Sequence, residues 1–367
     1  AGASGAITCV FKRGVTYRCT EAQQVWNTSA CLTADESGTE GNPIRLTSDP
    51  DWGTGEAVIA GSVVVPQEWQ NATIDDVPEG MDTTDVWYIN TAGWDPREND
   101  VTYAWVGNGT VNMTVLFEIV DGKTVDLHLA REPDWQEPGA NFATDYWSRW
   151  DGQKQVDVLD ADCNPTGETK TRPFDEDLEG YPCDFFNGGT LWSHWGSFMG
   201  SPTPATIEPG DYNPETGSLL PNHFPIQKGT RYMIENLPQF LDAPGEFYYD
   251  VDWSENSGRL FLRLSENRSP NDLQIELAVN YTTLEINDKN HIHISGLTFT
   301  RNGFNGNTAA HSVNITGSCS DIVIKNCKFD HLSNNGVQFV ADGDDDVMDN
   351  IFVSDNEFYD VKGHALR

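Results

Sequence analysis

Positive charge and long apolar runs are both scarce in this sequence. Its 367 residues include 22 Lys and Arg against 57 Asp and Glu, a formal net charge of −35 at pH 7. Binding a phosphate backbone needs a surface rich in Lys and Arg, so nucleic acid is excluded as a partner. No apolar stretch approaches the ~18 residues that a helical membrane span needs. Helix-forming runs are also few, whereas Gly, Pro, Asn and Asp are plentiful, so we expect an all-β protein.

Cysteine is limited to seven residues, and none shows the CxxC or Cys/His spacing of a zinc site. Their presence favours a compartment outside the reducing cytosol. Cys163 and Cys183 bracket a segment rich in Pro, Gly and Asp, and we predict a disulfide between them. Cys327 occupies an inward position of the repeat described below, where we expect a free thiol. Spacing leaves open the pairing of the other cysteines, Cys9, Cys19, Cys31 and Cys319.

Glycosylation motifs agree with export. The N-x-S/T pattern occurs at seven positions, and we expect glycan on at least three of them: Asn27, Asn71, Asn108, Asn112, Asn267, Asn280 and Asn314. The chain opens with Ala1 and shows no basic and apolar leader, as a mature chain does after signal removal. These features predict a secreted, extracellular glycoprotein.

The clearest pattern is a repeat in the last part of the chain. Segments 291–299, 321–329 and 350–358 each contain two alternating aliphatic residues, a turn residue and then an aromatic residue. Apolar residues that alternate with period two, interrupted by Gly, Asn and Asp, indicate short strands rather than helices. Repeats of this length predict the stacked turns of a parallel β-solenoid, with strands about 4.8 Å apart. Two inward columns are expected: Ile292, Ile322 and Ile351, and Phe299, Phe329 and Phe358.

The chain also resembles the right-handed parallel β-helix proteins of the pectate-lyase-like superfamily. Segments 37–46, 52–53 and 57–62 look like the opening turn of these proteins. Segments 130–135, 231–250 and 258–262 are similar to a glycosidase-like subgroup, although Glu132 is inserted in its "AR-P-W/N" stretch. The resemblance implies a right-handed parallel β-helix and activity as an extracellular polysaccharide lyase or glycoside hydrolase.

These patterns divide the chain into four parts, with a loop-rich β region inserted in the N-terminal half. We expect a cap and first turn at 1–66, the insertion at 67–230, a hairpin segment at 231–283 and regular β-helix turns at 284–367. The last turn stops at Arg367. We therefore expect either that further turns follow or that another subunit stacks on this end, since an uncovered solenoid end exposes strand edges.

Candidate catalytic residues follow the aromatic column. The repeat places a cation, an imidazole and carboxylates on one edge of three successive turns: Arg301, His331 and Asp360, with Asp330 in the adjacent column beside Thr300 and Tyr359. Such groups can carry out acid–base chemistry on a sugar. The alternative is that they are solvated turn residues joined by salt bridges.

An acidic loop offers oxygen ligands of the kind that Ca²⁺ prefers, but it lacks the spacing of an EF-hand. Its candidate ligands are Asp342, Asp344, Asp345, Asp346 and Asp349. The alternative is a solvated loop in a strongly acidic chain.

Two classes of function remain open. The first is a secreted carbohydrate-active protein that binds, and as an enzyme cleaves, an extracellular polysaccharide. The second is a structural glycoprotein of a cell surface, sheath or filament, assembled by stacking and without catalysis. Tryptophans could stack on sugars or pack in the core: Trp135, Trp147, Trp150, Trp192 and Trp195.

Overall fold

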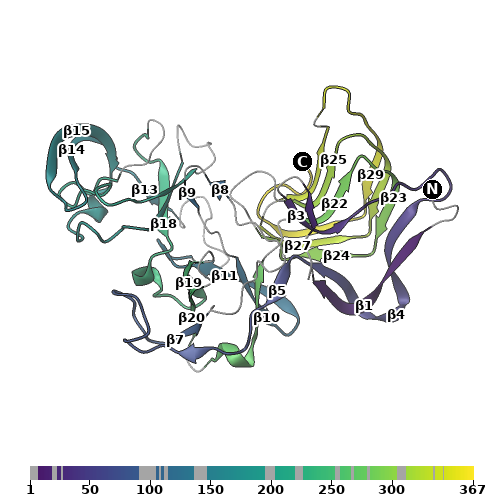
Figure 1. Cartoon of the computed structure of the whole chain (residues 1–367), viewed down its shortest axis with the longest axis horizontal. Helices are drawn as coiled ribbons and strands as arrows, with labels where there is room; N and C mark the ends of the chain where they lie inside the picture. Colours follow the sequence, from purple (N-terminus) through teal and green to yellow (C-terminus); the bar gives the residue numbers. More distant parts are fainter. Residues whose placement is uncertain are drawn as a thin grey trace.

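A computed structural model shows that the chain folds into two lobes built from β-strands. The parts of the chain that it describes are 7–18, 23–25, 28–90, 105–106, 109–110, 115–135, 147–194, 203–219, 226–252, 257–265, 268–278, 282–303, 311–333, 335–341 and 343–367. Within these parts there are strands and short 3₁₀ turns but no α-helix, as the composition predicts. The first and last segments lie together in one lobe, and the middle of the chain forms the other (Figure 1).

The first lobe, here called the curled-sheet lobe, consists mainly of parallel strands from successive turns of the chain. One sheet has the order β29-β26-β23-β4-β24-β27-β30, with β1 beside β4, and the other has the order β2-β3-β22-β25-β28. The strands are β1 (Thr8–Arg18), β2 (Gln23–Val25), β3 (Thr28–Thr33), β4 (Ile44–Ala60), β22 (Thr282–Asn287), β23 (Asn290–Ser295), β24 (Thr298–Thr300), β25 (His311–Thr316), β26 (Cys319–Lys325), β27 (Lys328–Leu332), β28 (Asn335–Val340), β29 (Met348–Ser354) and β30 (Glu357–Val361).

The predicted columns are present in register. Ile322 pairs with Ile292 on one side and with Ile351 on the other, all in parallel strands. The aromatic column is Phe299, Phe329 and Phe358, whose neighbouring ring centroids lie 5.3 and 4.8 Å apart in stacked orientation. Stacking buries apolar side chains that a single turn could not bury alone.

The turns between strands use left-handed backbone at matching positions. Gly296, Asn326 and Asp355 have φ of 66°, 52° and 55°, which suits Gly, Asn and Asp. A second such column holds bulkier residues, Arg301, His331 and Asp360, with φ of 53°, 48° and 48°. The chain bends at this second column, which is the predicted catalytic edge.

The second lobe is mostly antiparallel. Its larger sheet has the order β5-β21-β10-β11-β19-β20-β7-β6, and a smaller sheet has the order β12-β18-β16-β17, with β13 beside β18. Its strands are β5 (Ser62–Val64), β6 (Gln70–Asn71), β7 (Val86–Asn90), β8 (Trp105–Val106), β9 (Gly109–Thr110), β10 (Leu116–Val120), β11 (Lys123–Leu129), β12 (Arg131–Glu132), β13 (Ser148–Arg149), β14 (Gly152–Leu159), β15 (Pro165–Phe174), β16 (Thr190–Ser193), β17 (Thr203–Thr206), β18 (Arg231–Glu235), β19 (Glu246–Asp252), β20 (Ser257–Arg263) and β21 (Gln274–Ala278). The 3₁₀ turns are Glu176–Leu178, Pro238–Phe240 and Pro270–Asp272.

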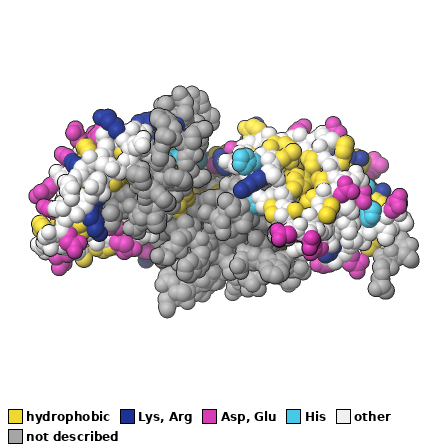
Figure 2. Space-filling model, turned by 90° about the horizontal axis from the view of Figure 1, so that it is seen from above, with side chains coloured by type: hydrophobic (Ala, Val, Ile, Leu, Met, Phe, Trp, Pro, Cys, Tyr) yellow, Lys and Arg dark blue, Asp and Glu magenta, His cyan; other side chains and the backbone are white. Residues whose placement is uncertain are grey.

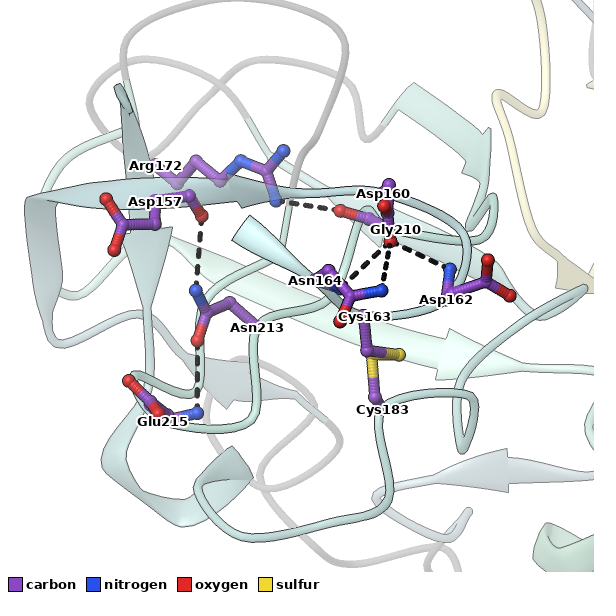
Figure 3. The surroundings of a disulfide bond; sticks show 10 residues. All are labelled: Asp157, Asp160, Asp162, Cys163, Asn164, Arg172, Cys183, Gly210, Asn213 and Glu215. Carbon is purple, nitrogen blue, oxygen red and sulfur yellow. Dashed lines mark hydrogen bonds between the residues drawn. A yellow bond between two sulfur atoms is a disulfide. The ribbon is translucent and has the colours of Figure 1, made fainter. Parts of the chain in front are cut away.

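The predicted disulfide lies beside the β14–β15 hairpin. Cys163 and Cys183 are bonded, with their Cα atoms 6.2 Å apart (Figure 3). Asp160 organises the hairpin turn, since its Oδ1 accepts hydrogen bonds from the backbone N–H groups of Asp162 and Asn164 at 3.0 and 2.9 Å. Cys327 is a buried free thiol, as expected, and Cys9 and Cys319 are also free.

Acidic side chains are spread over both lobes, and hydrophobic side chains gather on one face of the curled-sheet lobe (Figure 2). The final segment continues the stacking, since Leu366 forms a parallel bridge with Val337 of β28. None of the helical turns in the described parts is long and apolar enough to cross a membrane.

Candidate functional site at the seam between the two lobes

Strand β11 brings polar side chains of the second lobe against the predicted catalytic edge. Alternate residues of a strand point to the same face, so Thr124, Asp126 and His128 share one side of β11. Thr124 accepts a hydrogen bond from Arg301 at 3.0 Å, and Asp126 lies 2.7 Å from Lys362. These contacts define the seam between the lobes.

The seam gathers two of the predicted catalytic residues around a carboxylate from the other lobe. Ligand atoms of Asp126, His331 and Asp360 all lie within 4.8 Å of one another. The imidazole of His331 is held on both sides, with Nδ1 2.7 Å from Asp330 and Nε2 3.7 Å from Asp360. Lys362 contacts both carboxylates, at 2.7 Å from Asp126 and 2.8 Å from Asp360.

The environments of these carboxyl groups push their pKa values in opposite directions. Burial raises the pKa of Asp126, and the charge of Lys362 offsets this only in part. Burial alone would also raise the pKa of Asp330, but hydrogen bonds from His331 and Lys328 outweigh it and hold that pKa below its usual value. Asp330 is therefore held ionised against His331, whereas Asp126 holds its proton more tightly than an ordinary aspartate.

The side chain of Arg301 does not join this group. Its backbone does stack as expected, because its N–H donates to the carbonyl of His331 at 3.0 Å. The guanidinium instead turns to Glu276, a fully buried carboxylate 2.8 Å from Nε. Burial would raise the pKa of Glu276, but Arg301, Ser62 and Arg18 outweigh it and lower that pKa. A buried carboxylate is stable only with such partners. Arg301 therefore pairs with Glu276 and does not contact the cluster of Asp126, His331 and Asp360.

An exposed aromatic ring borders the cluster. Tyr359 is 64% exposed, and its ring centroid lies 5.7 Å from that of His331. On the same outer face, Lys328 lies 2.8 Å from Asp330 and borders a groove of about 370 Å³. Residues lining this groove include Arg13, Ser48, Glu56, Gly296, Asn326 and Glu357. Polar groups and an exposed ring therefore form one strip along the outer face of β27 and β30.

The predicted calcium loop does not converge. Among the described carboxylates of this loop, Asp344, Asp345, Asp346 and Asp349, no three bring ligand atoms within 4.8 Å of one another. Asp346 instead accepts hydrogen bonds from Gly343 and Ser318, at 2.7 and 3.1 Å. Asp342 lies outside the described residues.

Only two of the predicted glycosylation sites can be located. Asn71 is exposed at the end of β6. Asn314 is 7% exposed, and its amide nitrogen donates to both oxygens of Glu285 at 3.2 and 3.0 Å. Burial and these hydrogen bonds disfavour a glycan at Asn314, and glycosylation at Asn71 stays a prediction. The others, Asn27, Asn108, Asn112, Asn267 and Asn280, lie outside the described residues.

Two of the tryptophans belong to the core. Trp150 stacks on Tyr232 with centroids 3.9 Å apart, and Trp192 donates to Glu235 at 2.6 Å. Trp135 stacks on His128, with centroids 4.4 Å apart. Trp147 meets His194 edge-on at 5.0 Å. Trp195 lies outside the described residues.

Asp126 and Lys362 were not identified as site residues from the sequence. The alternation of apolar and polar residues from Val125 to Leu129 is enough to place Asp126 and His128 on one face of a strand. Nothing in the sequence pattern indicates which partner that face meets, because the contact joins two lobes far apart along the chain.

Comparison with known proteins shows a similarity of fold but no match to a sequence family. No protein-family model matches the chain, and no curated protein matches it. A solved structure titled "Glycoside hydrolase" is similar over 91% of this chain and 56% of its own, with 14% identity and a TM-score of 0.53. A structure titled as the complex of XylC with xylose covers 91% of this chain and 37% of its own, with 11% identity and a TM-score of 0.42. The chain thus spans about half, or less, of the lengths of these structures, and its fold is similar to that of the first.

Proposed function

We propose that this chain is a secreted, carbohydrate-active protein whose curled sheets form a right-handed parallel β-helix. Its substrate class is an extracellular polysaccharide, bound along the outer strip of β27 and β30. The observation that carries this proposal is the convergence of Asp126, His331 and Asp360 beside the exposed ring of Tyr359. The disulfide and the exposed sequon at Asn71 support the secreted location.

The chemistry that these groups support best is hydrolysis of a glycosidic bond. Glycosidases use two carboxyl groups, one that protonates the leaving oxygen and one that acts on the anomeric carbon. Asp126, with its raised pKa, is the proton donor in this proposal. Asp360 is its counterpart, and the 4.8 Å limit between their oxygens favours the short separation typical of retaining enzymes.

In that reaction, Asp126 gives its proton to the glycosidic oxygen as the bond to the anomeric carbon breaks. Asp360 bonds to that carbon, and water then displaces Asp360 while returning a proton to Asp126. Asp330 holds the His331 ring through Nδ1, so the other ring nitrogen faces Asp360. Tyr359 offers a flat apolar face to a sugar ring.

One observation favours the second class, a structural glycoprotein without catalysis. Lys362 bridges Asp126 and Asp360 and so fastens β11 to the curled-sheet lobe. In this alternative the cluster is an ionic clasp between the lobes, and the strip of polar residues carries no substrate.

The experiment that separates the two classes is a cleavage assay on a panel of neutral and acidic polysaccharides. The variants are Asp126→Asn and Asp360→Asn, with Asp157→Asn, an exposed aspartate of β14, as the matched control. We expect cleavage of at least one glycan by the wild type and the control, and a loss of about 10²-fold or more in the two site variants. Circular dichroism checks that all variants fold. An inactive wild type, or full activity in both site variants, would contradict the enzymatic proposal.

A further inference from the structure

A second group of carboxylates converges within the second lobe, away from the acidic loop. Oxygens of Asp134, Asp242 and Glu246 all lie within 4.8 Å of one another. The three residues come from separate segments. Asp134 follows β12, Asp242 follows the 3₁₀ turn Pro238–Phe240, and Glu246 begins β19.

Glu246 is the most unusual member of this group, because it is only 2% exposed. One of its oxygens, Oε2, accepts hydrogen bonds from the backbone N–H groups of Ala243 and Asp242, at 3.1 and 3.3 Å. The other oxygen, Oε1, is buried and has no hydrogen-bond partner among the described residues. A buried carboxylate oxygen without a partner costs free energy unless a ligand satisfies it.

Two cations act on this group through their charge: Arg131 on Asp134 and Glu246, and Arg263 on Asp242. Burial, together with the charges of Asp134 and Asp242, raises the pKa of Glu246 to about 8. Burial also raises the pKa of Asp242, with Asp134 adding to the effect. Three carboxyl groups held this close repel one another when ionised, which favours a further cation bound directly between them.

We propose that Asp134, Asp242 and Glu246 bind one divalent cation, and that this cation is calcium. The three ligands offer only oxygen, which Ca²⁺ prefers, whereas zinc sites in proteins use His and Cys. Oxygens up to 4.8 Å apart can surround one ion at the 2.3–2.6 Å distances typical of Ca²⁺. Asp242 is exposed and gives the ion a path from solvent, and water completes its coordination.

The ion would connect the second lobe to the seam. It would tie the segment after β12 to the start of β19 and so fix Trp135, the residue next to Asp134. Trp135 stacks on His128 of β11, and β11 carries Asp126 into the seam. The cation would thereby stiffen the strand that positions Asp126.

The test uses the purified 367-residue chain, freed of divalent ions by a chelator and dialysed. Calcium chloride is titrated by calorimetry, and terbium luminescence excited through tryptophan reports binding close to an aromatic ring. We expect one calcium per chain and a higher unfolding temperature with calcium than with chelator. Asp242→Asn should weaken binding about tenfold or more, because each charged ligand contributes to affinity. Glu246→Gln should do the same.

Two controls keep the interpretation clear. Asp157→Asn changes an exposed residue of β14 that is not part of the carboxylate group, and the double variant Asp344→Asn/Asp345→Asn removes two charges from the acidic loop. Both should bind calcium as the wild type does. If Glu246→Gln fails to fold, Asp242→Asn still tests the site, because Asp242 is exposed and its replacement does not alter a buried side chain. Absence of calcium binding, unchanged affinity in Asp242→Asn, or loss of binding only in the loop variant would each overturn the proposal.

Discussion

Asp126 and Lys362 form an ion pair of 2.7 Å that joins β11 of the second lobe to the segment following β30 of the curled-sheet lobe. Asp126 is largely buried, with 16% of its side chain exposed, whereas 43% of Lys362 is exposed. The pair therefore places a carboxylate with a raised pKa on the inner side of the seam and a flexible cation on its outer side. The following predictions depend on this seam and on the buried groups near it.

Removing the cation of this pair should weaken the seam only modestly. We expect Lys362→Met to lower the free energy of unfolding by about 1 kcal/mol, since partly exposed ion pairs contribute little. Urea unfolding followed by fluorescence measures this. Lys154→Met is the matched control, because Lys154 pairs with Glu179 at 3.5 Å on the surface and its loss should cost less. A larger loss of unfolding free energy in Lys154→Met than in Lys362→Met would show that Lys362 does not stabilise the seam.

Arg301 should matter much more for stability. Its partner Glu276 is completely buried, so Arg301→Met leaves a buried carboxylate short of one cation. We expect the free energy of unfolding to fall by about 3 kcal/mol. Lys325→Met, at an exposed position of β26, should change it by less than about 0.5 kcal/mol. Equal stability of the two variants would show that the Arg301–Glu276 contact is not needed.

Within the proposed hydrolase, His331 and Tyr359 should affect different kinetic constants. His331→Ala should lower kcat by about 10²-fold, because Asp360 loses the ring that faces it during the reaction. Tyr359→Ala should instead raise KM by about tenfold with kcat nearly unchanged, because a stacked ring binds substrate and transition state alike. Steady-state kinetics on the cleaved glycan gives both constants. A fall in kcat alone for Tyr359→Ala would remove its proposed role in binding.

Glu246 should make stability depend on pH. Its pKa is about 8 in the folded chain and near 4.5 in the unfolded chain, so between these values the folded state holds more protons. Stability from this group is present below about pH 4.5 and is lost as pH rises to about 8, by on the order of a few kcal/mol. Urea unfolding in chelator at pH 5 and pH 8 measures the loss. Glu246→Gln has no such group and should lose less between the two pH values; the same loss in both chains would refute the assignment.

Breaking the disulfide should destabilise the second lobe. Cys163 and Cys183 are 20 residues apart, and closing a loop of this length contributes roughly 3 kcal/mol in the chain-entropy model. The double variant Cys163→Ala/Cys183→Ala should unfold at correspondingly lower urea concentration than the wild type. Peptide mapping without reducing agent should recover the two cysteines in one linked fragment. Two free thiols at these positions would contradict the pairing.

The sequence by itself determined the strands and columns of the curled-sheet lobe. Ile292, Ile322 and Ile351 align because period-two alternation and a turn residue at a fixed offset recur at nearly constant spacing. Each strand then meets an equivalent strand of the next turn, so a local pattern is sufficient to set the register. The disulfide was also accessible from sequence, because its two cysteines flank one short segment.

Only the tertiary structure decided which side chains meet at the seam. Arg301 and His331 occupy equivalent positions of the repeat, yet one turns to Glu276 and the other to Asp330 and Asp360. Asn314 lies in a strand where alternation alone does not show whether the outer face is covered, and the fold buries it against Glu285. Burial and pairing of this kind depend on how a second lobe packs against the repeat. Such packing is set by contacts between segments far apart in the chain, which a repeating local pattern does not encode.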